Sequence, residues 1–190
     1  MKQSEIIIIN DLHVPFYDET SLEAVLTYIR KRKPDHVVIN GDLVDCYAIS
    51  RFVTNPEARD FKAEILKSEE VLHRIDIAIP SASKLHLIEG NHELRLETYL
   101  FSKAPELIGL LSFQESLRVK EKDINYIKFG GYLKFNDVII KHGTKASLNV
   151  RSKEIDKEGV NVVIGHSHRL GITYRTQRDK MVWCVENGHL

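Results

Sequence analysis

The sequence has few cysteines, no long apolar run and no excess of basic residues, the features typical of disulfide-bonded secreted proteins, membrane-spanning proteins and proteins that bind polyanions. Its 190 residues include only two cysteines, Cys46 and Cys184, which allow at most one disulfide bond. The longest nearly apolar stretch, Leu107 to Phe113, is interrupted by glycine and serine and is far shorter than the roughly 20 apolar residues of a membrane span. The 27 basic and 27 acidic side chains cancel, so a general surface for nucleic acid or anionic lipid is not expected.

What remains is the composition of an ordinary globular domain. Hydrophobic residues make up 43% of the chain, and a chain of this length buries about 70% of the surface that its unfolded form exposes. Met1 to Glu5 run directly into the isoleucines Ile6 to Ile9, a stretch far too short for the apolar region of a secretory signal. We therefore expect one domain over residues 1–190, in the cytoplasm, with reduced thiols and no membrane contact.

Short apolar runs alternate with helical patterns along the chain. Runs of four or five branched apolar residues predict buried strands, whereas apolar residues at i, i+3 and i+4 predict amphipathic helices. Strands are predicted at residues 6–9, 36–40, 85–88, 126–129, 132–135, 138–141, 160–164, 172–176 and 181–185. Helices are predicted at residues 19–33, 57–79 and 93–103. This alternation indicates an α/β domain built from layers of sheet and helix.

Five of the predicted strands end in clusters of Asp, Asn, Gly and His. Ligands of α/β sheets bind beyond the carboxyl ends of the strands, so these clusters should meet in space. In an extended chain Asp11 and His13 would point to the same side, where a carboxylate and an imidazole can share a divalent ion. Each cluster alone is typical of an ordinary turn. Five of the nine histidines, however, lie in these clusters: His13, His92, His142, His166 and His168.

The clusters also occur in a characteristic order. They read Asp11-x-His13, Gly41-Asp42-x-x-Asp45, Gly90-Asn91-His92-Glu93, His142-Gly143 and Gly165-His166-x-His168. In this order they resemble the calcineurin-like metallophosphoesterase superfamily. The resemblance implies that family's α/β fold, with two mixed β-sheets packed as a sandwich, flanked by helices, and metals at one edge. A TIM-barrel amidohydrolase fits less well because it needs about 250 residues.

The resemblance further implies a centre with two divalent metal ions. The first ion would be held by Asp11, His13 and His168, and the second by Asn91, His142 and His166. Asp42 would bridge the two ions, because two cations close together need an anion between them. Mixed oxygen and nitrogen ligands suit manganese, which we favour, with iron, zinc, nickel and magnesium as alternatives.

The implied reaction is the hydrolysis of a phosphate ester. Two metal ions lower the pKa of a bridging water, and the resulting hydroxide attacks phosphorus in line. His92 would protonate the leaving oxygen, and Asp45 would hold the ring of His92 in the right tautomer. Glu93 is expected to stabilise the N-terminus of the following helix.

The substrate is less closely specified. Ser/Thr protein phosphatases of the superfamily have an arginine after the second cluster, and this arginine binds the phosphomonoester dianion. This chain has Cys46 at that position and therefore lacks the contact. Arg51, Arg95 and Arg169 lie near the clusters, either as substitutes or as surface residues. A phosphodiester, in a nucleotide or nucleic acid, is therefore favoured as the substrate. The alternatives are a phosphomonoesterase, including a protein Ser/Thr phosphatase, and a non-catalytic metal-binding scaffold.

Two further expectations concern the rest of the chain. The remaining histidines are assigned no chemistry: His36, His73, His86 and His189. The poorly patterned residues 107–128 are expected to contribute to the rim around the substrate.

Overall fold

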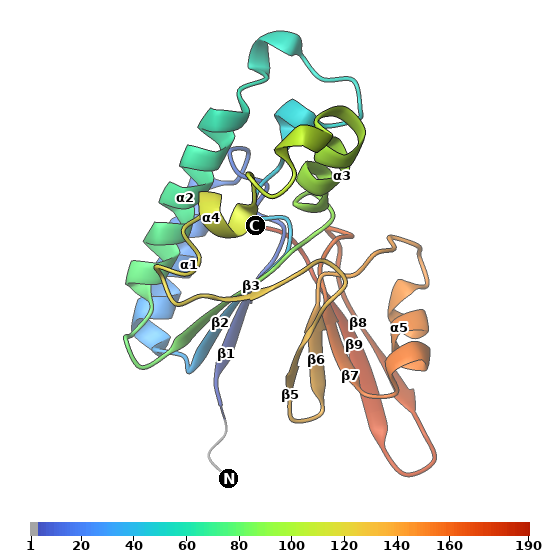
Figure 1. Cartoon of the computed structure of the whole chain (residues 1–190). Helices are drawn as coiled ribbons and strands as arrows, with labels where there is room; N and C mark the ends of the chain where they lie inside the picture. Colours follow the sequence, from blue (N-terminus) through green and yellow to red (C-terminus); the bar gives the residue numbers. More distant parts are fainter. Residues whose placement is uncertain (1–3) are drawn as a thin grey trace.

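The computed structural model describes residues 4–190, in which the strands form two sheets (Figure 1). The first sheet has the order β1 (Ile6–Ile9), β2 (His36–Asn40), β3 (Lys84–Ile88) and β4 (Asn125–Ile127). The second has the order β5 (Leu133–Phe135), β6 (Val138–Lys141), β7 (Asn161–Ile164), β9 (Met181–Asn187) and β8 (Leu170–Thr176). Neighbouring strands of the first sheet pair in parallel, whereas the second sheet combines parallel and antiparallel pairs. Mixed pairing, expected for both sheets, is thus found in the second.

Helices cover both outer faces of this sandwich (Figure 1). The first sheet is covered by α1 (Glu19–Arg32) and α2 (Phe61–Ala78), and the second by α5 (Val150–Glu158). Beyond the carboxyl end of β3 lies α3 (Leu94–Lys103), and the single-turn α4 (Phe113–Ser116) lies beside α2. Three short 3₁₀ turns complete the described elements: η1 (Tyr47–Ile49), η2 (Pro56–Ala58) and η3 (Pro105–Leu107). The predicted sandwich of two sheets flanked by helices is therefore confirmed.

The helix boundaries follow from local capping. The carboxylate of Asp18 accepts a hydrogen bond from the backbone N–H of Ser21 at 2.6 Å and starts α1, as predicted. The expected helix from residue 57 starts only at Phe61, because Asp60 caps it through the N–H of Ala63 at 2.9 Å. The proline of η2 lies in a separate turn before that cap. Helix α5 was not predicted from the sequence, because few of its residues are apolar.

The apolar core lies in three layers. The largest cluster fills the space between the first sheet and helices α1 and α2, and a second lies between the second sheet and α5. A smaller cluster between the two sheets contains Val38, Ile88, Ile140 and Val163. Much of segment 107–128 is also buried in the largest cluster, through Phe113, Leu117, Val119 and Ile124. This segment therefore completes the core as well as lining the surface.

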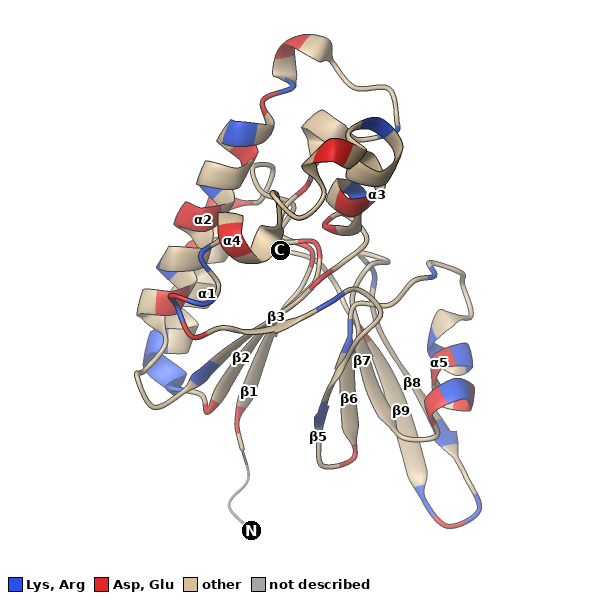
Figure 2. Ribbon diagram, viewed as in Figure 1, with Lys and Arg blue, Asp and Glu red and all other residues tan. Residues whose placement is uncertain are grey.

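The strand arrangement brings the polar clusters of the sequence to one edge. Strands β1, β2, β3, β6 and β7 each end directly before one of the five clusters. Figure 2 shows the charged residues gathered on the helices and the loops, while most strand residues are uncharged. Among residues 4–190, no helix is long and apolar enough to cross a membrane.

Candidate metal centre

Backbone hydrogen bonds join the loops that carry the clusters. The N–H of His13 donates to the carbonyl of Asp42 at 2.9 Å, and the N–H of Gly165 donates to the carbonyl of His142 at 3.0 Å. The N–H of His166 donates to the carboxylate of Asp11 at 3.0 Å. Loops that are up to 155 residues apart in the sequence are thereby held together around a common space.

A first group of potential ligand atoms comes from Asp11, His13 and His168. One ligand atom from each lies within 4.8 Å of the others. The Nε2 atoms of the two histidines are 3.0 Å apart, and Nε2 of His168 is 3.7 Å from Oδ1 of Asp11. The structure thus brings together the three residues expected to hold the first ion.

A second group is formed by Asp42, His142 and His166, again with ligand atoms within 4.8 Å of one another. Nε2 of His142 is 3.3 Å from Oδ2 of Asp42 and 3.0 Å from Oδ1 of Asn91. Nδ1 of His142 donates to the carbonyl of Asn40 at 2.9 Å, which leaves the Nε2 lone pair directed toward the site. The residues expected around the second ion are therefore also together.

Asp42 lies between the two groups. Its Oδ2 atom, which contacts His142, is also 3.8 Å from Nε2 of His13 in the first group. Its Oδ1 atom accepts a hydrogen bond from the backbone N–H of His92 at 2.9 Å. The side chain is almost completely buried, with 1% of the residue exposed. One carboxylate thus faces both groups, as a bridging ligand must.

The electrostatics of the site fit bound cations. Burial raises the pKa of Asp11 to about 7, although nearby His142 opposes the shift. Burial also acts to raise the pKa of Asp42, but the hydrogen bonds and positive charges of His142 and His92 together outweigh it and lower the value to about 2. Burial alone lowers the pKa of His142, but the hydrogen bond and charge of Asp42, together with the charge of Asp11, raise it to about 9, which shows how strongly negative the surroundings of this ring are. Buried carboxylates and imidazole lone pairs that face one another are suited to a divalent ion.

The backbone of the site is unusual. Five of the seven candidate ligands are non-glycine residues with positive φ: Asp11 (52°), His13 (48°), Asp42 (50°), His166 (67°) and His168 (57°). Such conformations cost about 1–3 kcal/mol each and cluster at functional sites. Glycines permit the close packing, because a Cβ atom on Gly41 would lie 2.2 Å from Nδ1 of His142 and one on Gly90 would lie 2.1 Å from Oδ1 of Asp42.

His92 and Asp45 lie beside the two groups. Nδ1 of His92 donates to the backbone carbonyl of Asp45 at 2.7 Å and is 3.1 Å from its carboxylate Oδ1. The same Oδ1 accepts from Nδ1 of His13 at 3.0 Å, so one carboxylate orients two imidazole rings. Arg95, on α3, donates from Nη2 to Nε2 of His92 at 2.8 Å and from Nη1 to the carbonyl of Asp45 at 2.8 Å. The sequence identified Asp45 as a partner of His92 but not of His13.

Glu93 does not serve the helix N-terminus in the way expected. Its buried carboxylate instead accepts three backbone N–H groups, from Val44 at 2.8 Å, Asp42 at 3.0 Å and Gly90 at 2.7 Å. These bonds connect the loop after β2 to the loop after β3. Glu93 therefore holds the backbone of Asp42 and that of Gly90, the residue before Asn91.

We expect Glu93→Gln to destabilise the protein by about 1–3 kcal/mol, because the amide turns one acceptor into a donor that faces buried N–H groups. Urea denaturation followed by circular dichroism measures this loss. Glu97→Gln, on the exposed side of the same helix, is the matched control and should leave the free energy of unfolding unchanged. Equal stability of both variants would contradict the role of Glu93 in holding the loops.

A second buried carboxylate supports the last cluster. Glu186, which is 0% exposed, accepts hydrogen bonds from Ser167 at 2.5 Å and from Nε of Arg169 at 3.0 Å, and pairs with Arg151. Ser167 separates the two candidate histidine ligands of this turn. Arg169, considered above as a phosphate contact, is therefore engaged in supporting the histidine turn. The sequence could not reveal this, because Glu186 directly follows the strand predicted at residues 181–185 and belongs to none of the polar clusters.

His189 was assigned no chemistry, yet it lies beside the site. Its ring stacks on that of His168 with centroids 4.9 Å apart, and its Nδ1 is 3.3 Å from the carbonyl of His168. By contrast, His36, at the start of β2, and His86, in the middle of β3, contact each other at 3.1 Å and touch none of the candidate ligands. The contact of His189 with His168 was not predicted, because His189 is the second-last residue of the chain and lies outside the polar clusters.

A sandwich of two sheets with Asp, Asn and His side chains gathered beyond the carboxyl ends of its strands defines an α/β protein built around a metal site. The chain belongs to the calcineurin-like phosphoesterase family, which it matches over residues 4–188. The resemblance observed in the sequence is thereby confirmed. This family acts on phosphate esters and binds two divalent metal ions.

Individual relatives extend this finding without naming a substrate. The Gene 54 protein of Mycobacterium phage L5 is 31% identical over 211 residues, covering 97% of this chain and 78% of the relative. The Gene 54 protein of Mycobacterium phage D29 is 30% identical over 208 residues with the same coverage. Vps29 of Chaetomium thermophilum is 14% identical, with 97% and 70% of the two chains covered and a TM-score of 0.44. Another solved structure is 11% identical, covers 98% and 91%, and has a TM-score of 0.55, which indicates a shared fold alone.

Proposed function

We propose that the protein hydrolyses phosphodiesters with two divalent ions, manganese being favoured. The observation that carries this proposal is the position of Asp42, whose Oδ2 atom faces the ligand groups of both expected ions. Asp11, His13 and His168 would hold one ion and Asn91, His142 and His166 the other. When bound, such ions activate a water molecule and neutralise the phosphate oxygens.

The chain's own residues supply positioning and proton transfer. Asp45 accepts from Nδ1 of both His13 and His92, so that Nε2 of His13 faces the first ligand group and Nε2 of His92 is left for the leaving group. As an imidazolium, which the carboxylate of Asp45 would stabilise, His92 would carry a second proton on Nε2 and deliver it to the leaving oxygen. In the structure Arg95 contacts this same atom, so the leaving group would take the place of the guanidinium. The displaced guanidinium would then be free to contact a phosphate oxygen.

The arginines near the site favour a diester over a monoester. Arg169 is bound to Glu186 and is not free to contact substrate. That leaves Arg95 as the arginine in direct contact with a proposed catalytic residue. A monoester dianion carries one more charge than a diester and is gripped best by several forked contacts. The alternative is a phosphomonoesterase. Arg95 also supports this alternative, because its guanidinium could form one forked contact with a monoester dianion.

Paired substrates and metals test this proposal. Purified protein is stripped of metal, resupplied with Mn²⁺, Mg²⁺ or Zn²⁺, and assayed on bis(p-nitrophenyl) phosphate and on p-nitrophenyl phosphate. We expect hydrolysis of the diester, highest with Mn²⁺, and slower hydrolysis of the monoester. Activity on the monoester alone would reverse the choice of substrate. Absence of activity with every metal would favour a non-catalytic scaffold.

A further inference from the structure

A large pocket opens beside the metal centre, between residues 48–59 and helix α3. Its volume is about 490 Å³, within the range of about 300–1,000 Å³ that is typical of small-ligand sites. In Figure 1 residues 48–59 form the arch at the top of the molecule between α2 and α3. We call this the basic pocket, defined by the lining residues Arg51, Phe52, Arg59, Arg95, Tyr99 and Lys103.

The charge of the basic pocket is all of one sign. Four of its lining residues are cationic, and none of the lining residues in the described part of the chain is acidic. Within residues 4–190, none of these four cations forms an ion pair with a carboxylate, unlike Arg74, Lys141 and Arg169 elsewhere. Unpaired cations around a concave surface attract an anionic ligand.

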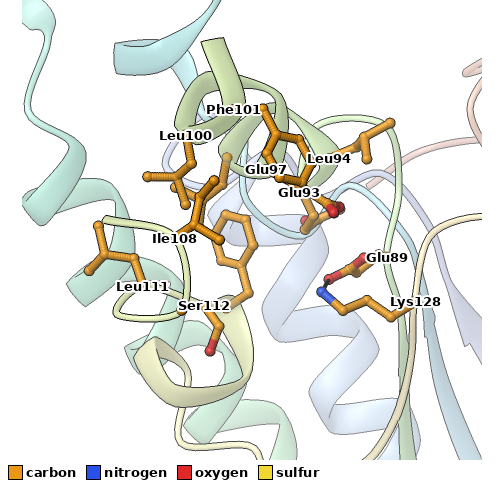
Figure 3. A pocket seen from close by; sticks show the side chains of 13 residues that line it. Glu89, Glu93, Leu94, Glu97, Leu100, Phe101, Ile108, Leu111, Ser112 and Lys128 are labelled. Carbon is orange, nitrogen blue, oxygen red and sulfur yellow. Dashed lines mark hydrogen bonds and ion pairs between the residues drawn. The ribbon is translucent and has the colours of Figure 1, made fainter. Parts of the chain in front are cut away.

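The other pocket beside α3 has the opposite character. It has a volume of about 160 Å³ and is lined by Glu89, Glu93, Glu97 and mainly apolar side chains (Figure 3). Its one cation, Lys128, is paired with Glu89 at 3.0 Å, as the dashed line in Figure 3 shows. An anion would be repelled there. The cationic lining is therefore a property of one side of α3 and not of the whole surface around it.

Two aromatic side chains line the basic pocket together with its cations. Phe52 is 60% exposed and Tyr99 is 41% exposed. The guanidinium of Arg51 lies 5.1 Å from the centre of the Phe52 ring. Aromatic faces next to cations are the combination that binds nucleotides, since bases stack on the rings and phosphates contact the cations.

The basic pocket is continuous with the metal centre. Asn91, expected to hold the second ion, is one of its lining residues. Arg95 also lines it while contacting Nε2 of His92. A substrate whose scissile phosphate lies at the metal centre would therefore extend its next phosphate and base into this pocket. The zero net charge of the chain argues against an extended duplex-binding surface, whereas one pocket lined by cations suits a single strand.

We propose that the basic pocket binds the nucleotide next to the scissile phosphodiester, so that the substrate class is a short single-stranded oligonucleotide. This assignment rests on the proposed function for the position of the scissile bond. Arg59 and Lys103 contact the neighbouring phosphate, and Phe52 and Tyr99 stack with its base. Arg59 and Lys103 are exposed and can be replaced without disturbing the core.

Binding without turnover is the first test. Fluorescence anisotropy measures the affinity of a fluorescein-labelled thymidine pentanucleotide for the full chain in EDTA, over a series of salt concentrations. The double variant Arg59→Ala/Lys103→Ala should bind at least about tenfold more weakly. Its slope of log affinity against log salt should be smaller by about 0.7, the contribution of one single-strand phosphate, since Arg59 and Lys103 contact the same phosphate. The matched control Arg30→Ala/Lys31→Ala removes two exposed cations at the end of α1 and should bind as the wild type does.

Kinetics with Mn²⁺ is the second test. The ratio of kcat/KM for the pentanucleotide to that for bis(p-nitrophenyl) phosphate should fall at least about tenfold in the double variant, in step with the lost binding. An unchanged ratio and unchanged affinity, in a protein that hydrolyses the aryl diester, would overturn the pocket assignment alone. Equal losses on both substrates would also overturn it, because the cations would then act on the metal centre. Tighter binding of a duplex would contradict the single-strand class.

The two proposals can fail separately. If the wild type hydrolyses neither substrate with any metal but binds the pentanucleotide through Arg59 and Lys103, the proposed function is wrong and the basic pocket stands. If the wild type hydrolyses the aryl diester but does not bind the pentanucleotide, the proposed function stands and the assignment of the basic pocket is wrong.

Discussion

Asp42→Asn will remove the capacity to bind two metal ions and will abolish measurable diester hydrolysis. Asparagine keeps the size of the side chain and can still accept the hydrogen bond from the N–H of His92 at Oδ1. It lacks the negative charge that faces both His13 and His142. Loss of a group behind the metal ligands typically costs about 10–100-fold in affinity, so loss of a bridging ligand itself should cost more than about 100-fold.

Metal content measured by inductively coupled plasma mass spectrometry, after dialysis against Mn²⁺, checks this result. The wild type should retain two ions per chain, and Asp42→Asn at most one. Asp179→Asn, in the exposed turn between β8 and β9, removes one carboxylate elsewhere and should retain both. Two tightly bound ions in Asp42→Asn would show that the carboxylate is not the bridge.

His92→Gln will retain both ions and lose about 10²–10⁴-fold in kcat, the usual contribution of a general acid. The expected loss depends on the leaving group. An alkoxide needs a proton as it departs, whereas p-nitrophenolate is a stable anion and departs without one. We therefore expect a large loss on the thymidine pentanucleotide, whose leaving group is a deoxyribose alkoxide, and a small one on bis(p-nitrophenyl) phosphate.

The same variant distinguishes two roles for His92. Its Nε2 is 3.9 Å from Oδ2 of Asp42, close enough that a ligand atom of His92 groups with those of His13 and Asp42. Loss of one ion from His92→Gln would therefore identify His92 as a ligand and contradict its proposed role in proton transfer. His73→Gln, an exposed position on α2, is the control for replacement of a histidine and should behave as the wild type.

The sequence predicted the elements whose signal is local. Buried strands such as β2 are short runs of branched residues, and each is followed directly by a polar cluster. Because parallel strands of one sheet end at the same edge, the meeting of Asp11 and Asp42 could be expected from the strands alone, whereas that of His142 depends on how the second sheet packs on the first. The set of expected ligands came from the resemblance to the calcineurin-like family.

The features that the sequence did not predict depend on contacts between distant segments. Glu93 adjoins His92 in the sequence, but its partner Val44 is 49 residues away, so its role in joining two loops had no local signal. Arg169 lies beside a candidate ligand and yet binds Glu186, 17 residues further on. Likewise Gly130 and Gly131 lie between β4 and β5. Two short strands joined by such a turn commonly form one hairpin, but here β4 belongs to the first sheet and β5 to the second.

The positive φ angles at Asp11, His13, Asp42, His166 and His168 have a consequence for engineering this fold. A designer seeking only a stable sandwich would put glycine at these five positions, because glycine adopts such angles without steric conflict. The natural chain instead has Asp and His at these positions, whose side chains are useful only when they bind a ligand. Substitutions at these five residues that raise stability will therefore lower activity. A search for stabilising substitutions that ignores activity will select these positions first.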